Sequence, residues 1–236
     1  MSNEAKLREI IEDFVKEVLA LLSEVKPTAA PAIPVPPAIP ADNLAAFFNH
    51  VRKPLFATKG RPNGTLTIPQ VQGHEQIIAE MKKRGVSLPH AAYILATSYH
   101  ETAKKMQPVR EGLNASDAWR KRNLRYYPWY GRGHVQLTWE ENYVKADKRL
   151  GLGGALVKNA DLALDPEVSA EILVLGMLEG WFSGDKKGRH TLERHITTGT
   201  LAQFKQARRI VNLMDKADLI AGHAIVYQEA LKKIGY

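Results

Sequence analysis

The spacing of apolar residues along the chain predicts a mainly helical protein. Two segments, 90–102 and 167–182, are apolar on almost every side, which is typical of helices buried in a core. Each follows residues that favour a helix start, Ser87 with Pro89 and Asp165 with Pro166. Amphipathic segments predict further helices over residues 43–50, 70–84, 201–212 and 215–233. No long alternating strand pattern occurs, so we expect no more than a small hairpin in the turn-rich segment 53–70.

The first 42 residues differ from the rest in pattern. Residues 4–25 place apolar side chains at alternating steps of four and three, the heptad pattern of an amphipathic helix. We expect this helix, over residues 1–25, either to dock on the remainder of the chain or to mediate self-association or contact with a partner's helix. Six prolines between Lys26 and Asp42 exclude a helix or a central strand and predict a semi-rigid linker. A domain spanning residues 43–236 would follow.

Basic residues are concentrated in that domain. The net charge of the chain is +8, but residues 1–43 hold four basic and seven acidic residues, so the remainder carries +11. A body this basic favours a polyanionic partner, which could be nucleic acid, an anionic membrane surface or an acidic wall polymer.

Other compositional signals narrow the class of protein. The absence of cysteine excludes disulfides and thiolate metal sites, and no histidine spacing matches a zinc motif, so we expect no metal and no cofactor. There is no apolar run of about 18 residues and no signal-peptide pattern. We therefore expect a protein made in the cytoplasm, without stable membrane insertion.

Two acids near the end of the first apolar helix are candidates for acid–base chemistry. Glu101 ends this helix, where desolvation and the negative end of the helix dipole both favour the protonated carboxyl that a general acid needs. Glu111 follows Pro108, which breaks the helix and lets the second acid return on a loop or hairpin to face Glu101. Two carboxyl groups across a cleft are what glycoside hydrolysis requires. The alternative is that both are ordinary surface acids.

The segment 123–143 combines aromatic rings, glycines and neutral polar groups. Gly131 and Gly133 flank Arg132 and permit tight backbone turns close to a ligand. Neutral hydrogen-bonding side chains follow at Gln136, Thr138 and Asn142. Flat aromatic faces beside amides and hydroxyls suit sugars. Two alternatives remain open: single-stranded nucleic-acid binding, because Arg and Lys alternate with aromatics here, and a structural aromatic core beneath a solvated basic face.

Three motifs occur in order along the chain: HET at 100–102, YGRGHVQLTWEENY at 130–143 and ARRIVN at 207–212. Together they resemble the chitinase-like fold of glycoside hydrolase family 19, in the compact form found in phage endolysins and related bacterial wall hydrolases. The resemblance covers roughly residues 44–234. It implies a mainly α-helical, lysozyme-like domain of two lobes, with a small β-hairpin region, a sugar-binding groove and an inverting mechanism without cofactor.

The resemblance also implies roles for individual residues. Glu101 matches the general acid, Glu111 is the best match for the general base, and Thr138 stands where a hydroxyl holds the attacking water. Substrate-binding positions are expected at Gln136, Asn142, Asn212, Tyr130 and Arg132. Arg208 or Arg209 is expected to line the site or pair with an acid.

The chain also departs from the family pattern. The two acids are only ten residues apart, a shorter segment than in plant chitinases of the family. His134 replaces the usual Pro or Ala, and Leu213 stands where Gly is frequent.

The resemblance and the basic charge together predict a peptidoglycan hydrolase of the endolysin type. It would cleave β-1,4 bonds between N-acetylmuramic acid and N-acetylglucosamine at the bacterial wall, after release by a holin or by lysis. Peptidoglycan, and no nucleic acid, is the expected partner. The alternatives are a chitinase and a wall-binding module without catalysis. Inversion predicts roughly 6.5–9.5 Å between the two carboxyl groups.

Overall fold

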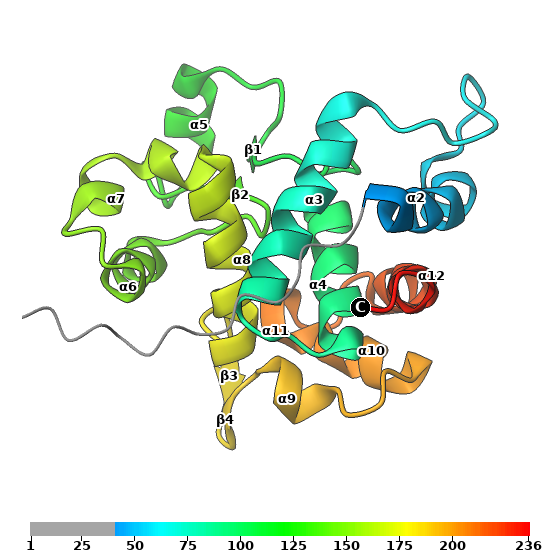
Figure 1. The fold of residues 1–236 in the computed structure, drawn as a ribbon. Coiled ribbons are helices and arrows are strands. Elements are labelled where there is room, and N and C mark those ends of the chain that lie inside the picture. Colours follow the sequence, from blue (N-terminus) through cyan, green and yellow to red (C-terminus); the bar gives the residue numbers. More distant parts are fainter. Residues whose placement is uncertain (1–40) are drawn as a thin grey trace, which may run out of the picture. The chain divides into compact units, whose positions relative to one another are not determined.

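The computed structural model describes residues 41–236, and this part of the chain is mainly α-helical, as the apolar pattern predicts (Figure 1). The helix expected over residues 1–25 lies outside the described residues, as does the linker expected over 26–42 up to residue 40. Its last two residues, 41 and 42, belong to α2 instead, so the linker was predicted to extend too far. The first elements in the chain are α2 (Ala41–Phe56), α3 (Ile68–Lys83), α4 (Leu88–Glu101), β1 (Val109–Arg110), α5 (Asp117–Asn123), β2 (Arg132–Gly133), α6 (Glu140–Leu150) and α7 (Ala155–Lys158). The later elements are η1 (Ala160–Leu164), α8 (Pro166–Glu179), β3 (Gly184–Asp185), β4 (Gly188–Arg189), α9 (Leu192–His195), α10 (Leu201–Ala207), α11 (Arg209–Asn212) and α12 (Ala217–Lys233).

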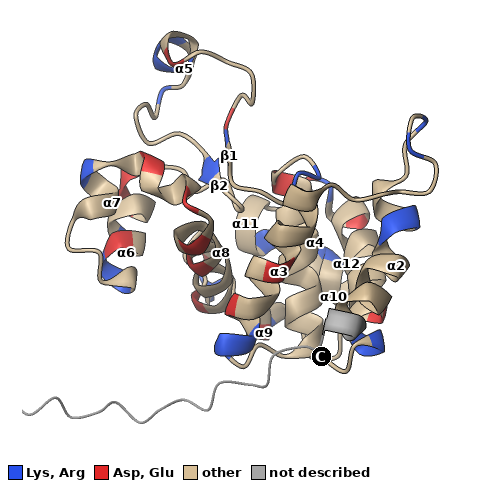
Figure 2. Cartoon of the chain, turned by 45° about the horizontal axis from the view of Figure 1, so that its top comes forward, with Lys and Arg blue, Asp and Glu red and all other residues tan. Residues whose placement is uncertain are grey.

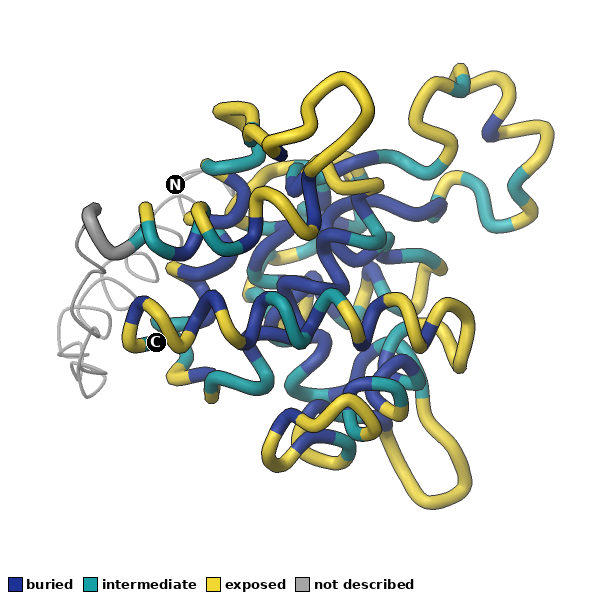
Figure 3. Tube along the Cα trace, turned by 90° about the vertical axis from the view of Figure 1, so that its right-hand side faces the viewer, coloured by how far each residue is buried: buried dark blue, intermediate teal, exposed yellow. Residues whose placement is uncertain are grey.

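The core forms around α4, whose residues from Ala91 to Tyr99 are all buried. α12 packs against α4, α2 and α10, while α3 packs against α8. Buried segments lie at the centre of the trace, and exposed loops project from it (Figure 3). The second apolar segment forms α8, which lies between the group of α2, α3, α4 and α12 and the group of α5, α6 and α7 (Figure 1). The prediction that both apolar segments are buried helices is therefore confirmed.

Local signals set most helix starts. The Asp165 side chain accepts hydrogen bonds from the backbone N–H groups of Glu167 and Val168 and so caps α8. Thr67 and Gln70 form a reciprocal capping box at the start of α3. α4 begins after Ser87, as expected, although the Ser87 side chain makes no capping bond.

Three local predictions are wrong in detail. The first helix begins at Ala41 and reaches Phe56, so Asn43 lies inside it instead of capping it. The segment 53–70 forms a single bridge between Thr58 and Arg61 and no hairpin. The helix predicted over 201–212 is divided at Arg208 into α10 and α11, although Arg208 keeps helical angles, φ −57° and ψ −27°; its N–H donates to the carbonyl of Lys205, three residues back.

The strands in residues 41–236 are two residues long and form two small antiparallel pairs. β1 pairs with β2 in the register Val109 opposite Gly133 and Arg110 opposite Arg132. This pairing joins segments more than twenty residues apart and sets Glu111, just after β1, beside Gly131. β3 pairs with β4 in a hairpin that projects beyond the end of α8 (Figure 1).

None of the helices within residues 41–236 is both long and apolar enough to cross a lipid bilayer.

Candidate active site

A cleft of about 370 Å³ lies where the end of α4 meets the segment that joins β2 to α6 and the end of α11. Five residues predicted from sequence line it: Glu101, Gln136, Thr138, Asn142 and Asn212. They come from three motifs that are well separated along the chain. The fold therefore brings most of the predicted site into one cavity.

Glu101 is the last residue of α4, and its side chain is 15% exposed. Its Oε1 accepts a hydrogen bond of 2.7 Å from Nη1 of Arg208, whose guanidinium is buried. The Arg208 Nε donates in turn to the backbone carbonyl of Asp215 at 2.8 Å. This is a correction to the apolar surroundings expected from the helix pattern: the carboxylate has a cation beside it. The structure also decides between the two candidate arginines, because Arg208 makes this pair and Arg209 donates to Gln206.

The Glu111 carboxylate has both oxygens engaged. Oε1 accepts a bond of 2.6 Å from the Tyr126 hydroxyl, and Oε2 accepts one of 2.9 Å from the backbone N–H of Gly131. Burial first, and then this hydrogen bond, raise the pKa of Tyr126 to about 12, so the hydroxyl keeps its proton and donates it. The two donors hold the carboxylate in one orientation. Glu111 itself does not line the 370 Å³ cleft, whereas Tyr126 does.

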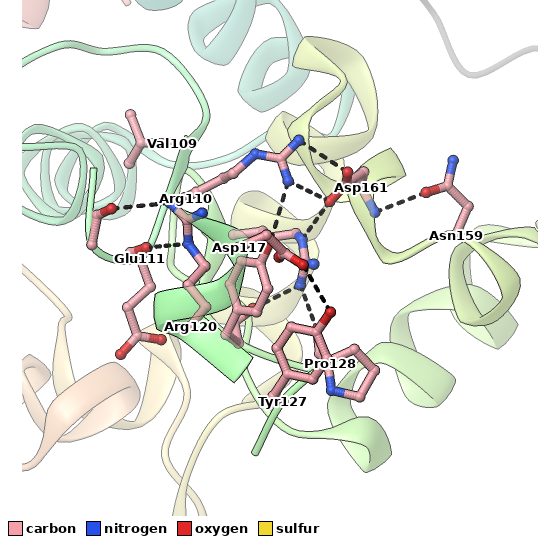
Figure 4. A network of polar contacts seen from close by, with 12 residues as sticks. Val109, Arg110, Glu111, Asp117, Arg120, Tyr127, Pro128, Asn159 and Asp161 are labelled. Atoms are coloured by element: carbon pink, nitrogen blue, oxygen red, sulfur yellow. Dashed lines mark hydrogen bonds and ion pairs between the residues drawn. The ribbon is translucent and has the colours of Figure 1, made fainter. Parts of the chain in front are cut away.

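Arg120 fixes the backbone on which Glu111 sits. Its Nε donates to the Glu111 carbonyl at 2.9 Å and its Nη2 to the Gly112 carbonyl at 3.0 Å (Figure 4). The guanidinium is buried and lies over the Tyr130 ring. Arg120 belongs to α5, whose last turn contains the basic residues Arg120, Lys121 and Arg122 (basic positions are blue in Figure 2).

A tight turn after β2 delivers Gln136 to the cleft. Arg132 and Leu137 exchange two backbone hydrogen bonds, of 3.1 and 2.8 Å, and close the turn. Gln136 takes a positive φ of 54° inside it, a conformation that non-glycine residues rarely adopt and that often occurs at functional sites. Its amide nitrogen donates to the Val109 carbonyl at 3.0 Å, which ties the turn to β1.

Gly131 is needed where these groups converge. A Cβ at this position would lie 2.8 Å from Oε1 of Gln136 and 3.2 Å from Oε2 of Glu111. The absence of a side chain therefore leaves room for both the Glu111 carboxylate, which accepts from the Gly131 N–H, and the Gln136 amide oxygen beside the same residue. Gln136 is thus a neighbour of both Glu111 and the cleft that holds Glu101.

The other predicted polar residues are oriented by the start of α6. The Thr138 hydroxyl donates to the Gln136 carbonyl at 2.8 Å, which leaves its oxygen able to accept a hydrogen bond. The Asn142 amide nitrogen donates to the Thr138 carbonyl at 2.9 Å. Asn212 is exposed at the end of α11.

Tyr130 and Arg132 do not line this cleft. They are buried, and they border a second cavity of about 570 Å³. The Arg132 guanidinium lies 3.6 Å from the centre of the Tyr130 ring and donates to Asp161 at 2.8 Å. Arg110 makes two bonds to the same carboxylate, of 2.7 and 2.9 Å (Figure 4). Tyr130 and Arg132 thus support the β1–β2 region from within, away from the Glu101 cleft.

Aromatic residues of the cleft were not singled out individually from the sequence. Trp139 is 41% exposed and takes a positive φ of 73° at the start of α6. Phe182 follows α8, and its ring lies over Gly176, where a Cβ would come within 2.1 Å of it. Tyr126 and Trp139 lie in the segment 123–143, which the sequence identified as rich in aromatic residues. The sequence did not indicate which of its rings face the cleft. Phe182 ends the segment 167–182, for which the sequence predicted a buried helix and no role in the site.

Histidines in residues 41–236 form no cluster with acids that could hold a metal ion. His134 stands beside the cleft segment but is buried, and its Nδ1 lies 3.0 Å from the Ser98 hydroxyl. Burial lowers the pKa of His134 to about 3, so its imidazole is neutral near pH 7.

No family model matches the chain. Over 42 residues, 17% of this chain, it is 50% identical to an acidic 26 kDa endochitinase of Solanum lycopersicum, and the match covers 17% of that protein. The fold can also be superposed on the crystal structure of a chitinase C variant, with a TM-score of 0.44 and 20% identity, over 81% of this chain and 91% of the other. Over this short stretch the chain is thus similar to a protein named endochitinase.

Proposed function

We propose that the chain is a glycoside hydrolase that cleaves β-1,4 bonds of peptidoglycan. One observation carries this proposal: a single cleft gathers a carboxyl, a hydroxyl, three amides and exposed aromatic surface from separate parts of the chain. A carboxyl supplies the proton that a glycosidic oxygen needs, and amides beside aromatic rings suit N-acetylated sugars. The sequence match to a protein named endochitinase supports the reaction class.

In this proposal Glu101 is the general acid. Its Oε1 accepts from Arg208, so Oε2 is the oxygen left to present a proton to the leaving oxygen. The cation keeps the side chain in one place at the edge of the cleft while the proton is transferred. The bond between the anomeric carbon and the leaving oxygen breaks as that oxygen takes the proton.

Glu111 is the proposed general base. It removes a proton from a water that attacks the anomeric carbon from the opposite face, which inverts the configuration. Thr138 donates its own proton to a carbonyl, so its oxygen can accept the second proton of this water and orient it. A carboxyl separation of roughly 6.5–9.5 Å is expected, because the water must fit between acid and base.

The substrate choice rests on charge. The region after residue 43 carries a net charge of +11, which favours an anionic wall polymer over neutral chitin. The wider role proposed is that of an endolysin acting at the wall after release from the host cytoplasm. Chitin is the second candidate, and the name of the tomato relative favours it.

The test is product analysis with purified peptidoglycan and with chitin oligomers, using the full chain and Glu101→Gln. We expect new reducing ends from peptidoglycan and a loss of at least 100-fold in the variant. Proton NMR of the first products should show the inverted anomer. Chitin turnover without peptidoglycan turnover would select the second candidate, and 1,6-anhydro ends would indicate a lytic transglycosylase. Equal activity of the variant would reject Glu101 as the acid.

A further inference from the structure

A third cavity, distinct from the one at Tyr130, adjoins the Glu101 cleft. It has a volume of about 690 Å³ and is bordered by α6, the residues after α8 and the β3–β4 hairpin. Trp139, Asn142 and Phe182 line both cavities. A polysaccharide strand bound beside Glu101 can therefore extend into this adjoining cavity. We call this adjoining cavity the α6–hairpin groove.

Two cations in the α6–hairpin groove have no acidic partner. Lys145 on α6 donates to the Trp181 carbonyl at 2.9 Å and lies 3.5 Å from the Asn142 side-chain oxygen. Arg189 on β4 donates to the Gly180 carbonyl at 3.3 Å. Within residues 41–236 neither side chain has a carboxylate oxygen within 4.0 Å. This differs from the Tyr130 cavity, where Arg110 and Arg132 share Asp161.

The acids of the groove form no ion pair with Lys145 or Arg189 among the described residues, although the charge of Glu141 raises the pKa of Lys145 by less than burial and Arg189 lower it. Asp185 is held by two bonds from Arg194, of 3.0 and 2.8 Å. Glu141 is exposed one turn before Lys145 and forms no ion pair in the described part of the chain. Burial first, and then the positive charge of Arg189, lower the pKa of Lys145. Two cations that repel each other in a groove become favourable when an anion lies between them.

We propose that Lys145 and Arg189 bind a carboxylate on the side group of a muramic sugar held in the α6–hairpin groove. This inference rests on the proposed function of the Glu101 cleft, which places the neighbouring sugars of the strand over the groove. N-acetylglucosamine polymers carry no carboxylate, so the pair would give preference for peptidoglycan over chitin. The carboxylate comes either from the lactyl ether of the sugar or from the attached peptide.

The experiment compares the full chain with the double variant Lys145→Met, Arg189→Met. Lys148→Met is the matched control, since Lys148 is exposed on the same helix and does not line the groove. Substrates are intact soluble peptidoglycan strands, strands stripped of peptide by an amidase, both strands after carbodiimide amidation of their carboxylates, and chitohexaose. The double variant should lose about tenfold in kcat/KM on at least one of the two unmodified strand types, since the lactyl carboxyl is in amide linkage in intact strands and free only in stripped ones. It should match wild type on amidated strands and on chitohexaose, and the control should match wild type throughout.

The two strand types identify the source of the carboxylate. A loss confined to intact strands would assign it to the peptide, and a loss confined to stripped strands to the lactyl group. Unchanged activity on both unmodified strands, or an equal loss on chitohexaose, would overturn the inference.

A binding measurement separates this inference from the proposed function. Calorimetry with Glu101→Gln protein compares a muramic-acid-containing tetrasaccharide with chitotetraose, with and without the double variant. A loss of affinity of about tenfold only for the acidic sugar supports the carboxylate site even if wild type cleaves neither polymer. Equal affinities for both sugars in the parent and the double variant would reject the site even if hydrolysis is observed.

Discussion

Glu101 and Glu111 are held by different kinds of structure. Glu101 ends a buried helix, and its partner Arg208 lies 107 residues away in sequence. Glu111 follows a two-residue strand, and its carboxylate is bound by Tyr126 and Gly131, 15 and 20 residues away. The candidate acid therefore depends on packing between distant core helices, and the candidate base depends on a compact local segment. Changes in one region should alter one carboxyl and leave the other intact.

The largest expected effect comes from removing each carboxyl in turn. Glu101→Ala and Glu111→Ala should each reduce kcat on peptidoglycan by about 10²–10⁴-fold. A sugar substrate with a dinitrophenyl leaving group needs no proton, so it should restore much of the activity of Glu101→Ala alone. Added azide or formate can replace the base and should restore only Glu111→Ala. Rescue of the two variants by the same reagent would contradict their division into acid and base.

Breaking the Arg208 pair should be the largest change in stability. Arg208→Met leaves Glu101 without its buried cation and is expected to lower the free energy of unfolding by about 3 kcal/mol. Urea unfolding followed by circular dichroism measures this loss. The control is Arg209→Met, whose side chain bonds only to Gln206 within residues 41–236, and it should change stability by less than about 0.5 kcal/mol. Equal losses in both would show that the ion pair is unimportant.

The core on the Glu101 side should also be sensitive to acid. His74 is buried against Tyr227, and desolvation lowers its pKa from the ordinary 6.5 to about 4. Between these pH values the unfolded chain binds a proton that the folded chain does not, so stability falls as pH falls. The free energy of unfolding lost in this way is on the order of 3 kcal/mol at pH 4, and there is no such loss above about pH 7. Urea unfolding measured from pH 7 to pH 4 should show that the free energy of unfolding falls less steeply with pH in His74→Phe than in the wild type. An equally steep fall in the variant would exclude His74 as the cause.

On the Glu111 side, Tyr126→Phe should have a moderate effect on activity. It removes one of the two donors to the carboxylate, and a hydrogen bond to a charged group typically contributes about 1.5–3 kcal/mol. We expect about a tenfold loss in kcat on peptidoglycan. Tyr127→Phe is the matched control, because that hydroxyl donates to Asp117. If both substitutions reduce kcat alike, the effect belongs to the aromatic segment and not to Glu111.

The smallest effect is expected at Leu213, on the Arg208 side. Leu213 has φ of 40° and ψ of −121°, close to the first central position of a type II′ turn, which glycine prefers. The turn leads to Asp215, whose carbonyl accepts from Arg208. Leu213→Gly should relieve strain and stabilise the protein by about 1 kcal/mol, or roughly 2 °C in Tm. Met214→Gly, at a position without positive φ, should destabilise; a fall in Tm for Leu213→Gly would contradict the strain.

The elements that depend on neighbouring residues could be predicted from the local pattern of the sequence. The apolar periodicity identified the two buried helices, and Asp165 with Pro166 marked the start of α8, because capping and helical burial are set by residues a few positions apart. The motifs also indicated five residues that share the cleft, since the resemblance ties them to one site. The end of the first helix and the expected hairpin over 53–70 were wrong, because short apolar runs and turn residues do not define how far an element extends.

The contacts of individual site residues could be known only from the tertiary structure. The sequence left Arg208 and Arg209 open, and only the approach of α11 to the end of α4 put one guanidinium against Glu101 and left the other at the surface. Tyr130 and Arg132 belong to the same motif as Gln136, yet their side chains are buried and Arg132 donates to the exposed Asp161, while Gln136 lines the cleft. Lys145 and Arg189 come together across α6 and the β3–β4 hairpin, and no sequence spacing connects them. Such contacts join positions far apart along the chain, so they exist only once the helices have packed.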